Sequence, residues 1–319
     1  MAKIDILGFP HAYDLTPPLS PASSYCGSES PCVLVFIHGW LLSRHYWKPL
    51  ISRLPDYHCL AYDLRGFGDS LPVPGKSQFH AGYSPAAYAR DVVILLEKLG
   101  ISRVWLIGHS LGGTIALWAA TYLPQIVQGV ICVNSGGGIY IQEEFERFRS
   151  AGKILVKWRP QWLGKIPLVH LMFSQDSVAY PIKRHWGRQR AIDFFGANYE
   201  AALGALLDST TEEQVHQLPL LVSRLKQPAY FVAGDRDKVM EPKYVRHLAS
   251  FHYLYGGGDE NAIVLPECGH LSMIEQPDAL AAEIRRLIAA HSTPETGFLT
   301  KNPDESKLRG EKPGFSSIQ

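Results

Sequence analysis

Short apolar runs alternate with helix-like amphipathic segments through most of this 319-residue chain. The continuous apolar runs lie at 32–37, 58–62, 104–108, 127–133, 229–233 and 262–265. Runs of this kind are typical of parallel strands that are covered on both faces. Helical periodicity fills the intervals at 85–99, 111–122, 243–251 and 278–290. The alternation predicts an α/β protein with a doubly wound, mostly parallel sheet.

One long segment, residues 135–227, interrupts this rhythm; it is rich in Trp, Phe, Arg and Lys and has mainly helical character. We predict a helical cap over the carboxyl edge of the sheet, where open α/β sheets bind ligands. The core is then made of residues 1–134 and 228–291. Residues 292–319 combine Pro, Gly, Ser, Thr and charge with little apolar period, which predicts a disordered tail.

Composition limits the function classes. A net charge of +1 gives no case for nucleic-acid binding by the whole molecule. The five cysteines are scattered and form no C-x-x-C pair, so we expect no metal site and no disulfide framework. No secretion signal or transmembrane stretch is recognised, and a reducing cytoplasm fits best.

The most informative motif is Gly108-His109-Ser110-Leu111-Gly112, which follows an apolar run and precedes a small-residue helix start. This context predicts a nucleophile elbow, a tight turn that lifts a strained serine above the sheet edge. Gly108 and Gly112 are needed because bulkier side chains would clash in the turn. We therefore predict Ser110 as the nucleophile and interpret His109 as a packing residue beneath the loop.

A serine hydroxyl needs a base, and the base needs an acid that orients it. In this arrangement the chain order is serine, acid, histidine. The strand at 229–233 is followed by Asp235 and Asp237, and the last strand is followed by His270. Either aspartate can supply the acid, whereas the other would cap the following turn.

Four motifs in order carry a family resemblance: His38-Gly39-Trp40, the segment Asp63–Ser70, the serine elbow, and the Gly-Asp-Arg-Asp and Cys-Gly-His pair. With them the chain resembles the α/β-hydrolase superfamily over roughly residues 4 to 291. The resemblance implies that the acid is Asp237, the third residue after the strand-end glycine, with Asp235 as the fallback. It implies no cofactor.

The oxyanion that forms during acyl transfer needs hydrogen-bond donors already in place. The backbone N–H of Leu111, directly after the nucleophile, is one expected donor. The second is expected from Trp40, in the loop after the first core strand. Gly39 would let the backbone approach closely, and His38 would stabilise the loop.

The nucleophile narrows the chemistry. Epoxide hydrolases and haloalkane dehalogenases, which share the Asp63–Ser70 segment, place Asp at the elbow, so Ser110 favours an acyl-enzyme. We predict a serine hydrolase acting on a carboxylic ester with a sizeable apolar part. A carbon–carbon hydrolase or an acyltransferase on the same machinery stays open, although Trp40 departs from the usual carbon–carbon hydrolase loop. A non-catalytic ligand-binding protein of this fold is a further alternative.

The predicted cap carries an unusual charge pattern. Between Arg147 and Arg190 there are ten basic residues and one acidic residue, Asp176, so this segment is +9 in a chain of +1. Trp158 and Trp162 lie among the basic residues. One interpretation is an ordinary cap whose apolar residues line the pocket. The other is peripheral contact with an anionic membrane, because basic segments with tryptophan suit that interface.

Overall fold

The computed structural model describes residues 1–19, 31–75, 82–136, 142–160, 162, 166 and 169–291. The tail predicted to be disordered, 292–319, lies outside the described residues, as does Cys26. The other four cysteines form no disulfide with one another, and the described residues contain no cluster of His, Cys, Asp and Glu suited to a metal ion. Within the same ranges, no helix has the length and apolarity needed to cross a membrane.

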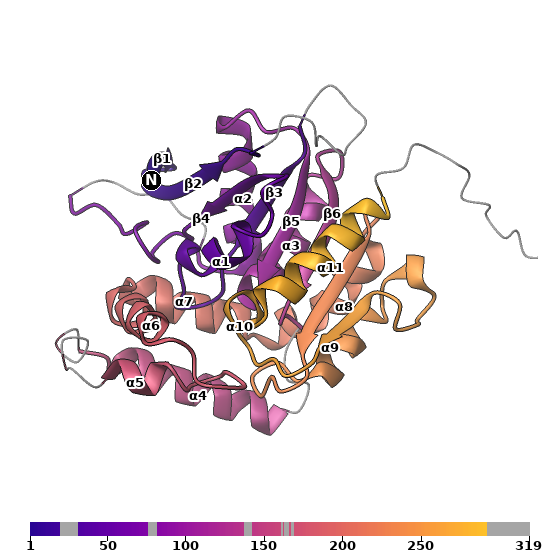
Figure 1. Ribbon diagram of the computed structural model, residues 1–319. Coiled ribbons are helices and arrows are strands. Elements are labelled where there is room, and N and C mark those ends of the chain that lie inside the picture. The colour runs from indigo at the N-terminus through magenta and orange to yellow at the C-terminus, as the bar shows by residue number, and fades with distance from the viewer. Residues whose placement is uncertain are drawn as a thin grey trace, which may run out of the picture.

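An eight-stranded sheet forms the centre of the molecule (Figure 1). Its strands are β1 (Ala2–Ile6), β2 (Phe9–Thr16), β3 (Val33–Ile37), β4 (His58–Tyr62), β5 (Val104–His109), β6 (Val127–Val133), β7 (Ala229–Gly234) and β8 (Ala262–Leu265). They lie in the order β1-β2-β4-β3-β5-β6-β7-β8. From β4 to β8 all neighbours are parallel, as the apolar runs predict.

The first two strands are not predicted by the apolar runs. β1 and β2 form an antiparallel hairpin on the edge of the sheet, and β2 pairs antiparallel with β4. The turn between them places Leu7 and Gly8 at φ 53° and 88°. Positive φ at two successive residues is typical of hairpin turns, and Gly8 is the sequence signal for it. Only part of each strand is buried, so the apolar pattern is weak there.

Helices cover both faces of the sheet, which explains the continuous apolar strands. One face is covered by α2 (Pro85–Lys98), α3 (Leu111–Tyr122) and α9 (Pro242–Ala249). The other carries η1 (Arg44–Trp47), α1 (Lys48–Ile51), α10 (Ser272–Glu275) and α11 (Pro277–Ala289). A single short helix, η3 (Tyr253–Tyr255), precedes β8. In β3, Val35 packs into the first layer and Phe36 into the second, and both are fully buried. Alternate residues thus enter opposite cores.

The segment between β6 and β7 is a helical insertion (Figure 1). Its helices are α4 (Gln142–Lys157), α5 (Val169–Phe173), α6 (Arg184–Gly196), α7 (Tyr199–Ser209) and α8 (Glu212–Arg224). Two hydrogen bonds fasten it to the loop after β3: the Trp40 indole donates to the Ala202 carbonyl (2.8 Å) and the Ser43 hydroxyl to the Asp193 carboxylate (2.9 Å). Burial raises the pKa of Asp193 to about 7.

Candidate active site

Ser110 lies in a sharp turn between β5 and α3, with φ 51° and ψ −119°. L-residues rarely adopt this conformation, which costs about 1–3 kcal/mol. A Cβ at Gly108 would collide with the Gly112 carbonyl, and one at Gly112 would collide with the Ile37 carbonyl. At Gly39 a Cβ would lie only 2.7 Å from His109 Nδ1, closer than a Cβ can approach another atom. The turn therefore requires all three glycines that the sequence singled out.

The loops after β7 and β8 bring a carboxylate and an imidazole together. Asp237 Oδ2 lies 2.8 Å from His270 Nδ1, and the Asp237 carboxylate is buried. Its Oδ1 accepts the backbone N–H groups of Val239 (2.8 Å) and Met240 (2.9 Å). Burial alone would raise the pKa of Asp237, but the His270 charge and hydrogen bonds from His270, Met240 and Asn134 hold it below its ordinary value. The carboxylate is thus ionised at neutral pH.

Asp235, the alternative acid, has a different environment. It is exposed, and its carboxylate accepts the Cys268 backbone N–H at 3.0 Å. This hydrogen bond lowers the pKa of Asp235. Asp235 thereby ties the loop after β7 to the loop that carries His270. The histidine contact itself is made by Asp237.

Two further histidines near Ser110 are buried and neutral. His109 Nε2 donates to the His270 carbonyl (2.7 Å), and burial together with the His270 charge lowers the pKa of His109 to about 3. His38 Nδ1 donates to the Gly39 carbonyl (2.8 Å), while its Nε2 accepts the Leu64 N–H (2.9 Å). Burial also lowers the pKa of His38. Neither histidine is a suitable general base for Ser110. Each instead stabilises a loop through its hydrogen bonds.

The segment Asp63–Ser70 also stabilises a loop near the site, the one that contains Trp40. The buried Asp63 carboxylate pairs with Arg44 and accepts the backbone N–H groups of Arg44 (2.6 Å) and Asp69 (2.8 Å). A Cβ at Gly68 would collide with that carboxylate. Because Arg44 begins η1, just after the Trp40 loop, the motif fixes that loop to the end of β4.

Asn134 is a site residue that the sequence interpretation missed. It follows β6 with φ 50°, and its amide donates to Asp237 Oδ2 (2.9 Å) and to the Gly269 carbonyl (3.1 Å). The Ser272 hydroxyl donates to the Asn134 amide oxygen at 2.5 Å. Asn134 therefore joins the acid to the histidine loop. The available signal was an asparagine, a residue that tolerates positive φ, at a strand's carboxyl end.

Glu275 is a second missed residue, and it holds the backbone on both sides of His270. Its carboxylate accepts three backbone N–H groups, those of Gly269 (3.0 Å), Leu271 (2.9 Å) and Ala179 (2.7 Å). The third belongs to the insertion, and His270 N–H itself donates to the Ser177 carbonyl (2.9 Å). Glu275 thus fixes the histidine loop to the loop of the insertion between α5 and α6.

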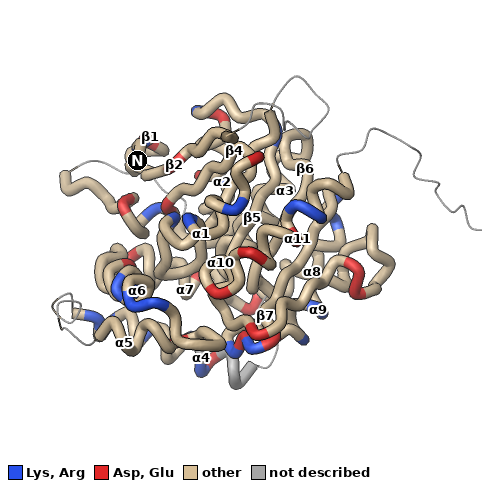
Figure 2. Tube along the Cα trace, in the orientation of Figure 1, with Lys and Arg blue, Asp and Glu red and all other residues tan. Residues whose placement is uncertain are grey.

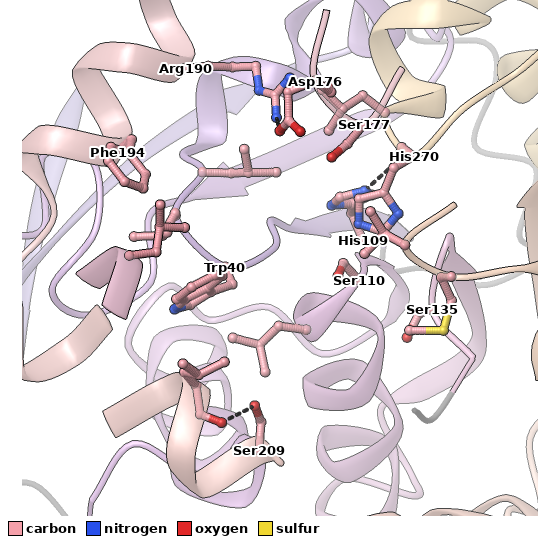
Figure 3. A pocket seen from close by; sticks show the side chains of 18 of the residues that line it. Trp40, His109, Ser110, Ser135, Asp176, Ser177, Arg190, Phe194, Ser209 and His270 are labelled. Carbon is pink, nitrogen blue, oxygen red and sulfur yellow. Dashed lines mark hydrogen bonds and ion pairs between the residues drawn. The ribbon is translucent and has the colours of Figure 1, made fainter. Parts of the chain in front are cut away.

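A cavity of about 770 Å³ lies between the core and the insertion, with Ser110 and His270 in its wall (Figure 3). Trp40 and Leu111 also line it. Leu111 is the first residue of α3, so its N–H has no partner within the helix and is free to bind an anion. The rest of the lining is mostly apolar and comes from both the core and the insertion.

Among lysines and arginines, the described lining of the cavity contains Arg190 of α6. Its guanidinium donates to the carbonyls of Phe173 (2.7 Å) and Asp176 (2.5 Å) and to the Asp176 carboxylate (2.8 Å). Figure 3 shows this pair in the wall of the cavity, across from Ser110. Arg190 is therefore neutralised by its own neighbours.

Residues 33–277 match the family model described as the alpha/beta hydrolase fold. The chain belongs to this family. The matched span runs from β3 to the start of α11 and contains Ser110, Asp237 and His270. Along this α/β hydrolase, Ser110, Asp237 and His270 follow one another in the order serine, acidic residue, histidine that is typical of the fold.

Curated relatives resemble the chain over most of its length, and solved structures share its fold. The chain is 28% identical over 272 residues to a 2-succinyl-6-hydroxy-2,4-cyclohexadiene-1-carboxylate synthase of Serratia proteamaculans, covering 80% of this chain and 92% of the relative. It superposes on a thermophilic esterase from Thermogutta terrifontis with a TM-score of 0.68 at 20% identity, covering 92% and 100%. The epoxide hydrolase CorEH gives 0.66 at 18%, covering 91% and 98%.

Proposed function

We propose that this α/β hydrolase is a serine esterase that cleaves carboxylic esters with a sizeable apolar part. The observation that carries the proposal is a buried, ionised Asp237 bonded to His270 at the wall of a largely apolar cavity that also holds Ser110. These three groups are the nucleophile, base and orienting acid that acyl transfer needs.

In the proposed first step, Ser110 Oγ attacks the ester carbonyl and His270 Nε2 takes the hydroxyl proton. Asp237 fixes the tautomer, because its carboxylate accepts a hydrogen bond only from a protonated Nδ1. His270 then returns the proton to the leaving alcohol, which leaves an acyl group on Ser110. A water molecule then attacks the acyl carbonyl while His270 takes its proton, and His270 returns that proton to Ser110 Oγ as the acyl–oxygen bond breaks and the acid leaves.

The negative oxygen of the tetrahedral intermediate is assigned to the backbone N–H groups of Leu111 and Trp40. The first lies at the N-terminus of α3, where the helix dipole also favours negative charge. The second follows Gly39, whose lack of a side chain brings this loop against the serine elbow. Losing one such donor costs about 3 kcal/mol of transition-state stabilisation.

The cavity lining favours an apolar substrate over an anionic one. The curated relatives are named as synthases of a succinyl cyclohexadiene carboxylate, a ligand with carboxylate groups. A carboxylate buried in the cavity would need a free cation, because an unpaired buried charge is costly. In the described lining the candidate is Arg190, which is already bonded to Asp176 and two carbonyls. This argues against transferring the relatives' reaction to this chain.

Initial rates on p-nitrophenyl esters from acetate to decanoate test the proposal. We expect kcat/KM to rise by at least about tenfold from acetate to hexanoate, since each buried methylene is worth about 0.8 kcal/mol. The matched comparison is p-nitrophenyl butyrate against p-nitrophenyl hemisuccinate, which differ by a terminal carboxylate. We expect the butyrate to react faster. A preference for the hemisuccinate would instead support the anionic ligand class of the relatives.

A second prediction concerns Glu275, which we propose positions His270 without touching substrate. Glu275→Gln replaces one acceptor oxygen with an N–H₂ group that faces backbone N–H donors. We expect kcat on the best ester to fall by on the order of ten- to a hundredfold with little change in KM, because small displacements of a catalytic group are costly. Glu283→Gln is the control: Glu283 is a half-buried residue of α11 whose carboxylate pairs with Arg286 and not with the histidine loop, so this change should leave kcat unaltered. Equal losses in both variants, or a loss confined to KM, would argue against this role.

A further inference from the structure

The insertion exposes several large apolar side chains close together. Ile154 and Leu155 near the end of α4, Trp158 just after it and Met172 in α5 have exposed fractions of 61%, 48%, 73% and 74%. We call these four residues the rim. Helical spacing places Ile154 and Trp158 on one face of the chain. Single exposed apolar residues are ordinary, whereas a group of them marks a surface that contacts something else.

The rim coincides with the mouth of the cavity. Leu155, Trp158 and Met172 belong to its lining, although about half or more of each side chain is open to solvent. A residue that satisfies both conditions lies where the cavity meets the outside. The apolar surface of the rim is therefore continuous with the apolar interior that leads to Ser110.

The structure divides the basic residues of the insertion into two groups. Arg149, Arg159 and Arg190 bond to carbonyl groups of the insertion itself and are structural. Lys165 lies outside the described residues. The other six are exposed and form no ion pair with another described residue: Arg147, Lys153, Lys157, Lys183, Arg184 and Arg188. The charge available to a partner is thus six residues, fewer than the +9 of the sequence segment.

These six lie on α4 or at the start of α6. Lys153 and Lys157 alternate with rim residues on α4, and Lys183, Arg184 and Arg188 belong to the start of α6. Helices α4, α5 and α6 lie together at one end of the molecule (Figure 1), and Figure 2 shows Lys and Arg on α4 and α6 there. An apolar mouth bordered by unpaired cations is complementary to a surface that is apolar inside and anionic outside.

We propose that the rim docks on an anionic lipid surface, with the mouth of the cavity facing the membrane. Trp158 has the amphipathic ring that suits the headgroup boundary, and the lysines have the charge that anionic headgroups attract. The docking proposal depends only on the rim and the six basic residues. A second statement, that the membrane supplies an ester substrate dissolved in the lipid, also depends on the proposed esterase function.

The test is flotation of the full-length Ser110→Ala protein with vesicles of phosphatidylcholine, or of phosphatidylcholine and phosphatidylglycerol in equal parts. We expect at least about tenfold more protein bound to the anionic vesicles, with binding weakened by added salt. Trp158→Ala with Met172→Ala should reduce binding by on the order of tenfold. Lys153→Glu with Lys157→Glu should do so as well. The matched control, Arg90→Glu with Lys226→Glu, reverses two exposed charges outside the rim and should retain binding.

Several outcomes overturn docking. Equal binding to both vesicle types removes the role of charge. If charge reversal abolishes binding but the Trp158 and Met172 variant binds normally, the surface is a general site for polyanions. A concentration-dependent dimer that Trp158→Ala dissociates would assign the rim to a second copy of the chain. Vesicle binding without esterase activity in the wild type would retain docking and reject the proposed function.

Discussion

Replacing Ser110 with alanine is expected to lower kcat on the best p-nitrophenyl ester by about 10⁶-fold, the loss typical of removing a nucleophile from a serine triad. Ser110 is the hydroxyl that the elbow presents to the cavity beside His270 (Figure 3). Removing it eliminates the acyl-enzyme, since His109 is held neutral by burial and bonded to a carbonyl. Because the residual rate of Ser110→Ala is expected to be so low, it should be measured under single-turnover conditions or with a tightly binding probe.

Ser135 provides the matched control. It is a second buried serine in the wall of the same cavity, but it follows β6 without strained φ and is not part of the elbow. Ser135→Ala should reduce kcat by no more than about tenfold, because it removes a single pocket contact. A fluorophosphonate probe should label wild type and Ser135→Ala but not Ser110→Ala. Absence of labelling in the wild type would favour the non-catalytic interpretation of the fold.

Asp237→Asn is expected to lower kcat by about 10⁴-fold while the protein stays folded. An asparagine amide can donate to Nδ1, which would favour the tautomer that carries its proton on the wrong nitrogen. It would also remove the negative charge that stabilises the His270 imidazolium. Both effects act on the chemical step, so KM should change little. The measurement is kcat and KM for the preferred ester, with a thermal unfolding curve for each variant.

Asp235→Asn is the natural counterpart, since it makes the same chemical change two residues away. Asp235 is exposed and bonds a backbone N–H, so we expect its loss to cost no more than a few-fold in kcat, the effect of a loosened surface contact. Similar losses in the two variants would show that the carboxylates act together on the loop. A larger loss at Asp235 would reverse the assignment of the acid.

The difference between Asp235 and Asp237 could not be predicted from the sequence pattern. Both aspartates follow the same strand in a short polar loop, and no periodic pattern separates them. What separates them is the path of that loop, which buries Asp237 against His270 and Asn134, and leaves Asp235 in solvent. Choosing between them from sequence required a family resemblance. The contact itself joins residues 33 positions apart.

The charged insertion gives a second example. Its segment sums to +9, which would overstate the charge offered to a membrane. Arg159 is buried against backbone carbonyls at the end of α6, and Arg190 is held by Asp176. Composition cannot distinguish a guanidinium that satisfies carbonyls from one in solvent, because that depends on which helices pack together.

The sequence by itself determined the parallel strands, most of the core helices and the serine elbow. Each depends on local facts: apolar runs long enough for strands covered on both faces, helical periodicity, and glycines where a Cβ would collide with the turn. Only the tertiary structure showed which aspartate contacts His270, which backbone groups Asn134 and Glu275 bond, and where the cavity mouth lies. Those depend on contacts between segments distant in the chain, whose energies appear only when the loops are packed together.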